Sequence, residues 1–205
     1  MRSGLLALSL FFISTSALAA TLTTPANHQM TWHLPDGWEI ATSLPEALLA
    51  ETVRSLAAEA REHKAAPTPA QLEQAARNRL AANELLLFHP QSGAWIGFDF
   101  SPLHQGEAQP TRESLQLSAR YALESLQNEA GIELLDSEHR SLSLPGAADT
   151  RLILARYLKG ESETLLQGLV GALPGEWFYI YATSYPGKAD LAQIEELFKQ
   201  LAFTP

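Results

Sequence analysis

The chain of 205 residues contains no cysteine. This absence excludes disulfide bonds and thiolate ligands for zinc, and it removes the lipidated cysteine by which a bacterial lipoprotein is anchored. Lys and Arg are scarce as well, 14 against 23 Asp and Glu, so the formal net charge is −9. Because phosphate contacts need clustered Lys and Arg, this balance argues against a nucleic-acid partner and against an anionic membrane surface.

No apolar run is long enough for a transmembrane helix, which takes about 20 residues. The run Leu5–Ile13 is shorter; it follows a positive start, Met1-Arg2, and precedes an A-x-A site, Ala17-Leu18-Ala19. This order is typical of a secretory signal peptide. We therefore expect cleavage after Ala19, a flexible lead over residues 21–27, and a mature chain that is neither a lipoprotein nor stably inserted in a membrane. The absence of any N-x-S/T sequon favours a bacterial periplasm.

Motifs for catalysis are missing too. The sequence has no G-x-S-x-G elbow, no glycine-rich phosphate loop, and no H-x-x-H or H-E-x-x-H pair among its six histidines. These motifs supply the nucleophiles, phosphate contacts and metal ligands of common enzyme classes. We therefore predict that the protein is not an enzyme and that it uses no cofactor and no metal.

Two consecutive segments between residues 43 and 82 each begin with residues that are typical of a helix N-terminus. Ser43 and Glu46 have the spacing of a capping box, Thr68 precedes a proline in the same way, and the residues between are rich in Ala, Leu and Glu. Further helices are predicted over residues 111–130, where Thr111 is the expected cap, and over residues 189–201. The first two helices are separated by a short proline-containing connection, which predicts a helical hairpin.

The most regular strand pattern covers residues 151–184. Tight turns at Gly160 and Gly175 divide it into three strands, which is typical of an antiparallel meander. With the helices, this pattern predicts an α+β fold in which a central antiparallel sheet carries helices on both faces. We expect a single domain over residues 20–205, with the helical hairpin inserted at about residues 43–82.

An aromatic strand face is one candidate binding surface. Trp177, Tyr179 and Tyr181 alternate along the last strand of the meander, and Arg156 on a preceding strand is expected to border them. Tyr and Trp combine contact area with a polar group, which suits a partner surface. The alternative is a sheet face covered by the helical hairpin.

A second candidate lies earlier in the chain. Asp99 and Trp95 point to the same side of a predicted strand, and His104 follows in the loop over residues 101–110. An aromatic ring beside a carboxylate is typical of glycan sites, and a nearby histidine supports a hydrolase or a small-ligand site. The alternative is that Asp99 simply reaches solvent.

Two segments resemble the PsbP-like and DcrB-like proteins. The opening Trp32-His33-Leu34-Pro35-Asp36-Gly37-Trp38 is similar to the F/W-x-x-P-x-G-W hairpin of that family, and the meander is followed by a terminal helix as it is there. The resemblance covers about residues 30–38 and 111–203. It implies an α/β/α sandwich, exported bacterial members, and docking onto another macromolecule rather than catalysis. The chain departs from the family by its long Ala-rich segment over residues 43–82.

These observations lead to one functional hypothesis and two alternatives. The hypothesis is a non-enzymatic periplasmic protein that docks onto a protein partner in the cell envelope, and an acidic chain suits a basic partner. The candidate partner-binding residues are Trp177, Tyr179, Tyr181, Arg156, Trp95 and Asp99. The first alternative is a periplasmic hydrolase or small-ligand protein that uses Asp99 and His104. The second is an envelope immunity protein or chaperone.

Overall fold

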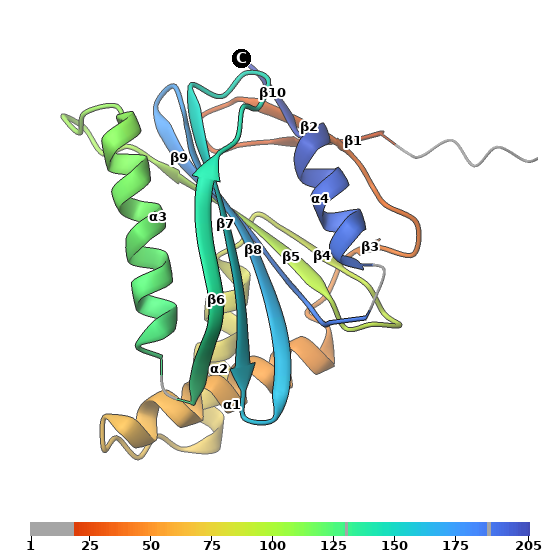
Figure 1. Cartoon of the computed structure of the whole chain (residues 1–205), viewed down its shortest axis with the longest axis vertical. Coiled ribbons are helices and arrows are strands. Elements are labelled where there is room, and N and C mark those ends of the chain that lie inside the picture. Colours follow the sequence, from red (N-terminus) through yellow and green to blue (C-terminus); the bar gives the residue numbers. More distant parts are fainter. Residues whose placement is uncertain (1–18, 130, 188–189) are drawn as a thin grey trace, which may run out of the picture.

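A computed structural model describes residues 19–129, 131–187 and 190–205 of the chain. The predicted signal peptide lies outside the described residues, except for Ala19. The fold is an α/β/α sandwich around a seven-stranded sheet in the order β3-β4-β5-β9-β8-β7-β6, in which all neighbouring strands are antiparallel (Figure 1). The predicted α+β class with a central antiparallel sheet is therefore confirmed.

The elements have the following bounds. The large sheet contains β3 (Glu39–Ile40), β4 (Leu85–Phe88), β5 (Trp95–Pro102), β6 (Ile132–Ser141), β7 (Asp149–Lys159), β8 (Ser162–Leu173) and β9 (Glu176–Ser184). A small three-stranded sheet contains β1 (Ala19–Thr23), β2 (Gln29–His33) and β10 (Ala202–Thr204). The helices are α1 (Glu46–Glu62), α2 (Pro69–Ala81), α3 (Arg112–Gln127) and α4 (Asp190–Gln200).

Both faces of the large sheet are apolar, and each has its own cover. The first face carries the main core, in which Phe98, Phe178 and Ile180 are fully buried under α4 and the small sheet. The second face is covered by α3 and, beside it, by the hairpin of α1 and α2 (Figure 1). Because alternate side chains point to opposite faces of a strand, a sheet covered on both sides shows apolar residues in both alternations.

The segment at residues 30–40, which is similar to the opening hairpin of the family, forms two short strands that do not pair with each other. β2 pairs with β1 and β10 in the small sheet, whereas β3 pairs with β4 in the large one. The Pro35 turn between them therefore carries the chain from one sheet to the other, and it allows both Trp32 and Trp38 to be buried in the main core. The prediction of a flexible lead over residues 21–27 is wrong as well, because most residues of the strand β1 lie in this segment.

The predicted N-terminal caps are present in two of the three helices for which the sequence predicts one. The Thr68 side chain accepts a hydrogen bond from the Gln71 backbone, and Thr111 does the same with Ser114. The expected capping box of Ser43 is absent, because α1 begins after Pro45, with no side-chain cap. Among the residues that the structure describes, no helix combines the length and the apolar character needed to span a bilayer.

One buried carboxylate joins the two sheets. Glu176, at the start of β9, is fully buried, and its two oxygens accept hydrogen bonds from the Thr24 hydroxyl and from the backbone N–H of Ala26. Thr24 and Ala26 belong to the connection between β1 and β2. A buried carboxylate has to be paired or hydrogen-bonded, so this contact fixes the small sheet against the large one.

Candidate functional site

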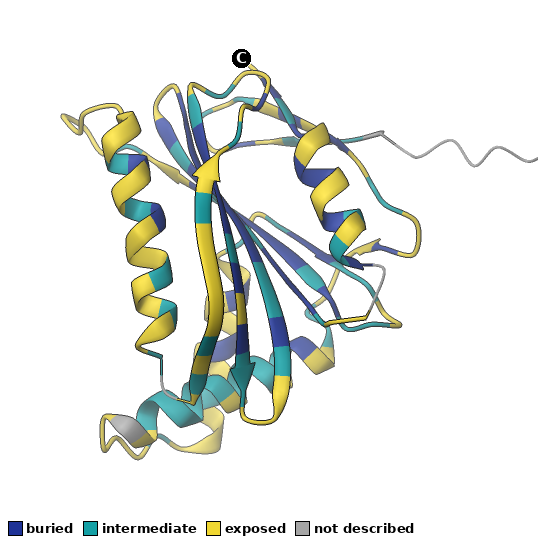
Figure 2. Ribbon diagram, in the orientation of Figure 1, coloured by how far each residue is buried: buried dark blue, intermediate teal, exposed yellow. Residues whose placement is uncertain are grey.

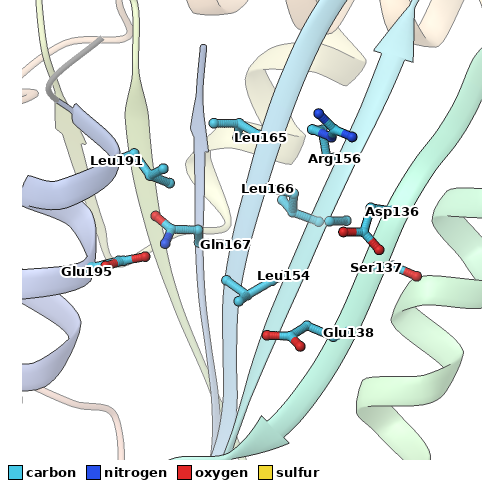
Figure 3. Close-up of a pocket in the computed structure, with 11 residues that line it drawn as sticks. Asp136, Ser137, Glu138, Leu154, Arg156, Leu165, Leu166, Gln167, Leu191 and Glu195 are labelled. Atoms are coloured by element: carbon cyan, nitrogen blue, oxygen red, sulfur yellow. The ribbon is translucent and has the colours of Figure 1, made fainter. Parts of the chain in front are cut away.

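Helix α4 covers only part of the first sheet face. It packs against β2 and β9, and β6, β7 and β8 extend beyond it with exposed and half-buried residues (Figure 2). A cavity of about 210 Å³ lies between α4 and these strands (Figure 3). We call it the acidic groove. Its lining residues are Asp136, Ser137, Glu138, Leu154, Ala155, Arg156, Leu165, Leu166, Gln167, Leu191 and Glu195.

Strand register builds the groove as two rows. One row runs from Asp136 on β6 to Arg156 on β7 and Leu165 on β8, and these residues are direct cross-strand partners. The second row runs in the same way from Glu138 to Leu154 and Gln167. Leu191 and Glu195, one turn apart on α4, form the opposite wall. Residues distant in sequence thus meet because three strands and one helix present the same face.

Gln167 is the unusual member of this set. Its side chain is 2% exposed, and neither its amide nitrogen nor its amide oxygen has a hydrogen-bond partner. It lies between α4 and Leu154 (Figure 3). A buried polar group without a partner costs about 1–3 kcal/mol, and such groups are rare in native structures. The unpaired amide therefore lowers the stability of the free protein. A residue that does so is expected to serve a purpose other than folding.

Negative charge predominates around the groove. Asp136, Glu138 and Glu195 line it, against the single guanidinium of Arg156. Arg156 is itself 3.6 Å from the carboxylate of Glu163, on the neighbouring strand β8. With Glu163 included, four carboxylates surround this one guanidinium, and this excess gives the groove an acidic character.

Arg156 is the one predicted site residue that lines the groove. We expected it beside Trp177 and Tyr179, and that placement is wrong. Tyr179 lies in register with Val170 and Arg151, on the second sheet face, whereas Arg156 points to the first face. An even separation keeps two residues of one strand on the same face, and Arg151 and Arg156 are separated by an odd number.

Trp177 and Tyr179 lie under α3. Their rings stack with centroids 6.1 Å apart, and they pack against a cluster that includes Leu115 and Ala119 of the helix. Burial raises the pKa of the Tyr179 hydroxyl. The expected cover by the helical hairpin is wrong for this pair, since α3 provides it.

Trp95 and Tyr181 lie beside the helical hairpin. Their rings meet edge to face with centroids 5.3 Å apart, and the Tyr181 hydroxyl donates a hydrogen bond of 2.9 Å to Asn83. Both line a cavity of about 240 Å³ between α1, α2, the end of α3 and the sheet. The hairpin thus covers this part of the second face, in agreement with the alternative interpretation of the sequence.

Asp99 and His104 are not brought together in a cavity. Asp99 is half-buried opposite Tyr179, and burial raises its pKa. His104 is exposed in the loop after β5, where its backbone N–H donates to Glu107. Neither residue lines the acidic groove or the cavity beside Trp95. The geometry therefore gives no support to a hydrolase that uses this pair.

The raised pKa of Asp99 leads to a pH-dependent prediction. The unfolded chain ionises this carboxyl near its ordinary pKa of 3.8, below the pKa in the folded protein, so ionisation destabilises the fold above that range. Asp99→Asn is therefore expected to increase the free energy of unfolding at neutral pH, and this gain is expected to vanish as the pH falls toward 3.8. Urea titrations at several pH values measure the difference. The exposed Asp36→Asn is the matched control, and an equal response of both variants would contradict the prediction.

Sequence comparisons identify no relative: no protein-family model and no curated protein matches the chain. Solved structures do match it. LpqN of Mycobacterium tuberculosis, which is involved in cell envelope biogenesis, aligns with a TM-score of 0.56 at 14% identity, over 92% of this chain and 91% of LpqN. Cyanobacterial PsbP (CyanoP) from Synechocystis sp. PCC 6803 aligns with a TM-score of 0.50 at 10% identity, over 96% of this chain and 99% of CyanoP. The resemblance predicted from the sequence is thus confirmed at the level of the fold.

Proposed function

Because the chain has the PsbP-like fold, we propose that it is an exported, non-enzymatic protein that docks onto a protein partner in the cell envelope. The acidic groove carries the proposal. It combines an apolar floor, a charged rim and a buried amide without partners, and such a combination suits recognition. The role of LpqN in cell envelope biogenesis supports the cellular location.

Cleavage of the predicted signal peptide is compatible with the fold. A cut after Ala19 would remove only the first residue of β1, and Ala20 and Leu22 would still pair with Trp32 and Met30. Both side chains also pack against the main core. The mature chain therefore keeps the small sheet.

The export proposal makes a direct prediction. When the full chain is expressed in a Gram-negative bacterium, we expect the periplasmic fraction to contain a protein whose first residue is Ala20. Ala19→Arg is expected to block processing, because the cleavage site requires a small residue, and the precursor would then accumulate. Intact mass spectrometry distinguishes the two species. A wild-type chain that stays in the cytoplasm, or that keeps residues 1–19, would contradict export.

The docking proposal is tested by site-specific photocrosslinking. A photoreactive phenylalanine analogue is placed at Glu195, an exposed residue of α4 that lines the acidic groove, and at Ala75, an exposed position on α2. In cells of the source organism, we expect one discrete adduct from position 195, containing an envelope protein, and none from position 75. An adduct from position 75 alone would assign docking to the helical hairpin instead. The absence of any adduct would contradict docking.

A further inference from the structure

The groove has a chemistry that selects its occupant. We propose that it binds an extended peptide segment of the partner, which carries a basic side chain next to an aliphatic one, and that Gln167 pairs with the backbone of that segment. The inference rests on the proposed docking function and names the chemistry of the partner.

The amide of Gln167 matches a peptide backbone. A primary amide offers two donor hydrogens and one acceptor oxygen, and an extended residue presents its own N–H and C=O on the same side of the chain. One such residue can therefore satisfy both ends of the amide at once. In the free protein, both ends are buried without partners. Rotation of the side chain from the α4 interface toward the groove would exchange this unfavourable state for a paired one.

The rim selects a basic side chain. Asp136 and Glu138 lie on adjacent rows at the edge strand β6, and Glu195 faces them from α4. Arg156 is the one guanidinium among the lining residues, and Glu163, 3.6 Å from it, adds a fourth carboxylate, so negative charge is in excess. A Lys or Arg of the peptide would gain opposite charges there, and an Asp or Glu would be repelled, which is how charged rims distinguish partners.

The floor selects an aliphatic neighbour. Leu154 and Leu165 stand on adjacent strands, each half-buried, and Leu191 closes the space from α4. The open volume of about 210 Å³ exceeds what a single water needs. An apolar side chain placed there would be removed from water together with these leucines. The same acidic rim disfavours nucleic acids and anionic lipids.

The test selects peptides without assuming their sequence. Random decapeptides displayed on phage are panned against the mature wild-type chain and counter-selected on the bare support. We expect the enriched sequences to contain Lys or Arg beside Leu, Ile or Val. A synthetic peptide of that consensus is expected to lose about tenfold or more in affinity for Gln167→Leu, and for the double variant Asp136→Asn, Glu138→Gln. Gln105→Leu, in an exposed loop, should bind as wild type does.

Stability separates a binding role from a structural one. If the amide of Gln167 is unpaired because the peptide is absent, Gln167→Leu removes an unfavourable buried group. The variant should then unfold at a higher urea concentration and bind the peptide more weakly. A variant that unfolds earlier would show that the amide is structural and would overturn the inference. So would enriched peptides that lack basic residues, or equal affinity for Gln167→Leu.

The two proposals fail in different ways. If position 195 crosslinks an envelope protein that binds Gln167→Leu as tightly as it binds wild type, docking stands and the peptide inference is overturned. If consensus peptides bind through Gln167 but position 195 gives no adduct in cells, the groove chemistry stands and the docking function is overturned.

Discussion

Glu176→Ala is expected to lower the free energy of unfolding by about 3–5 kcal/mol. Glu176 is fully buried at the start of β9, where its carboxylate accepts hydrogen bonds from the Thr24 hydroxyl and from the backbone N–H of Ala26, the latter at 3.1 Å. Truncation would leave both donors without an acceptor and would open a void at the junction of the two sheets. A hydrogen bond to a charged group contributes about 1.5–3 kcal/mol, so two of them account for the loss.

The measurement is urea-induced unfolding followed by tryptophan fluorescence. Glu176→Gln keeps the shape and one acceptor oxygen, so it should lose less than Glu176→Ala. Thr24→Val removes one of the two donors to the carboxylate, together with the acceptor for the backbone N–H of His28, and it should also lose less. Hydrogen exchange should show increased exchange in β1 and β2 of Glu176→Ala, because the contact ties their connection to the large sheet. Wild-type stability of Glu176→Ala would mean that the junction is held by the surrounding apolar contacts alone.

Local patterns predicted much of this fold because they report local physics. Alternating residues and tight turns revealed β7, β8 and β9, whose pairing register is continuous. Capping signals located α2 and α3 to within a few residues. The division of residues 30–40 between two sheets was missed, since it depends on β10, the last strand of the chain, pairing with β2. A contact across that separation leaves no trace in a short window of sequence.

The groove could not be predicted for the same reason. Its rows join β6, β7 and β8 with α4, and each residue alone has an ordinary explanation. Glu195 has the pattern of a surface charge on a helix, and Asp136 that of a residue on a strand edge. Gln167 did give a signal, because it is the one polar side chain in the apolar run over residues 165–173. A lone amide in such a run, within a sheet covered on both faces, indicates either a buried polar network or a ligand.

The aromatic candidates show the opposite case. Trp177 and Tyr179 have the composition of a partner surface, yet both rings lie beneath α3 in the structure. Amphipathic aromatic residues serve equally well at a helix–sheet interface, because one end can be apolar while the hydroxyl finds a partner. Composition alone does not distinguish an interface inside one chain from an interface between two. Only the position of the covering helix does.

Gly146→Ala is expected to destabilise the fold by about 2–5 kcal/mol. Gly146, before β7, has a φ of +83°, and a Cβ there would overlap the backbone carbonyl of Phe203 on β10. Phe203 is also held nearby by its N–H, which donates to the Pro145 carbonyl at 2.9 Å. Gly106→Ala is a matched control, because Gly106 has a φ of +86° but open space around it, so it reports the backbone strain alone.

We expect Gly146→Ala to be the more damaging in thermal and urea unfolding. Equal losses in the two variants would mean that β10 yields to the added methyl group, and that the C-terminal strand is held less firmly than its close approach to Gly146 implies.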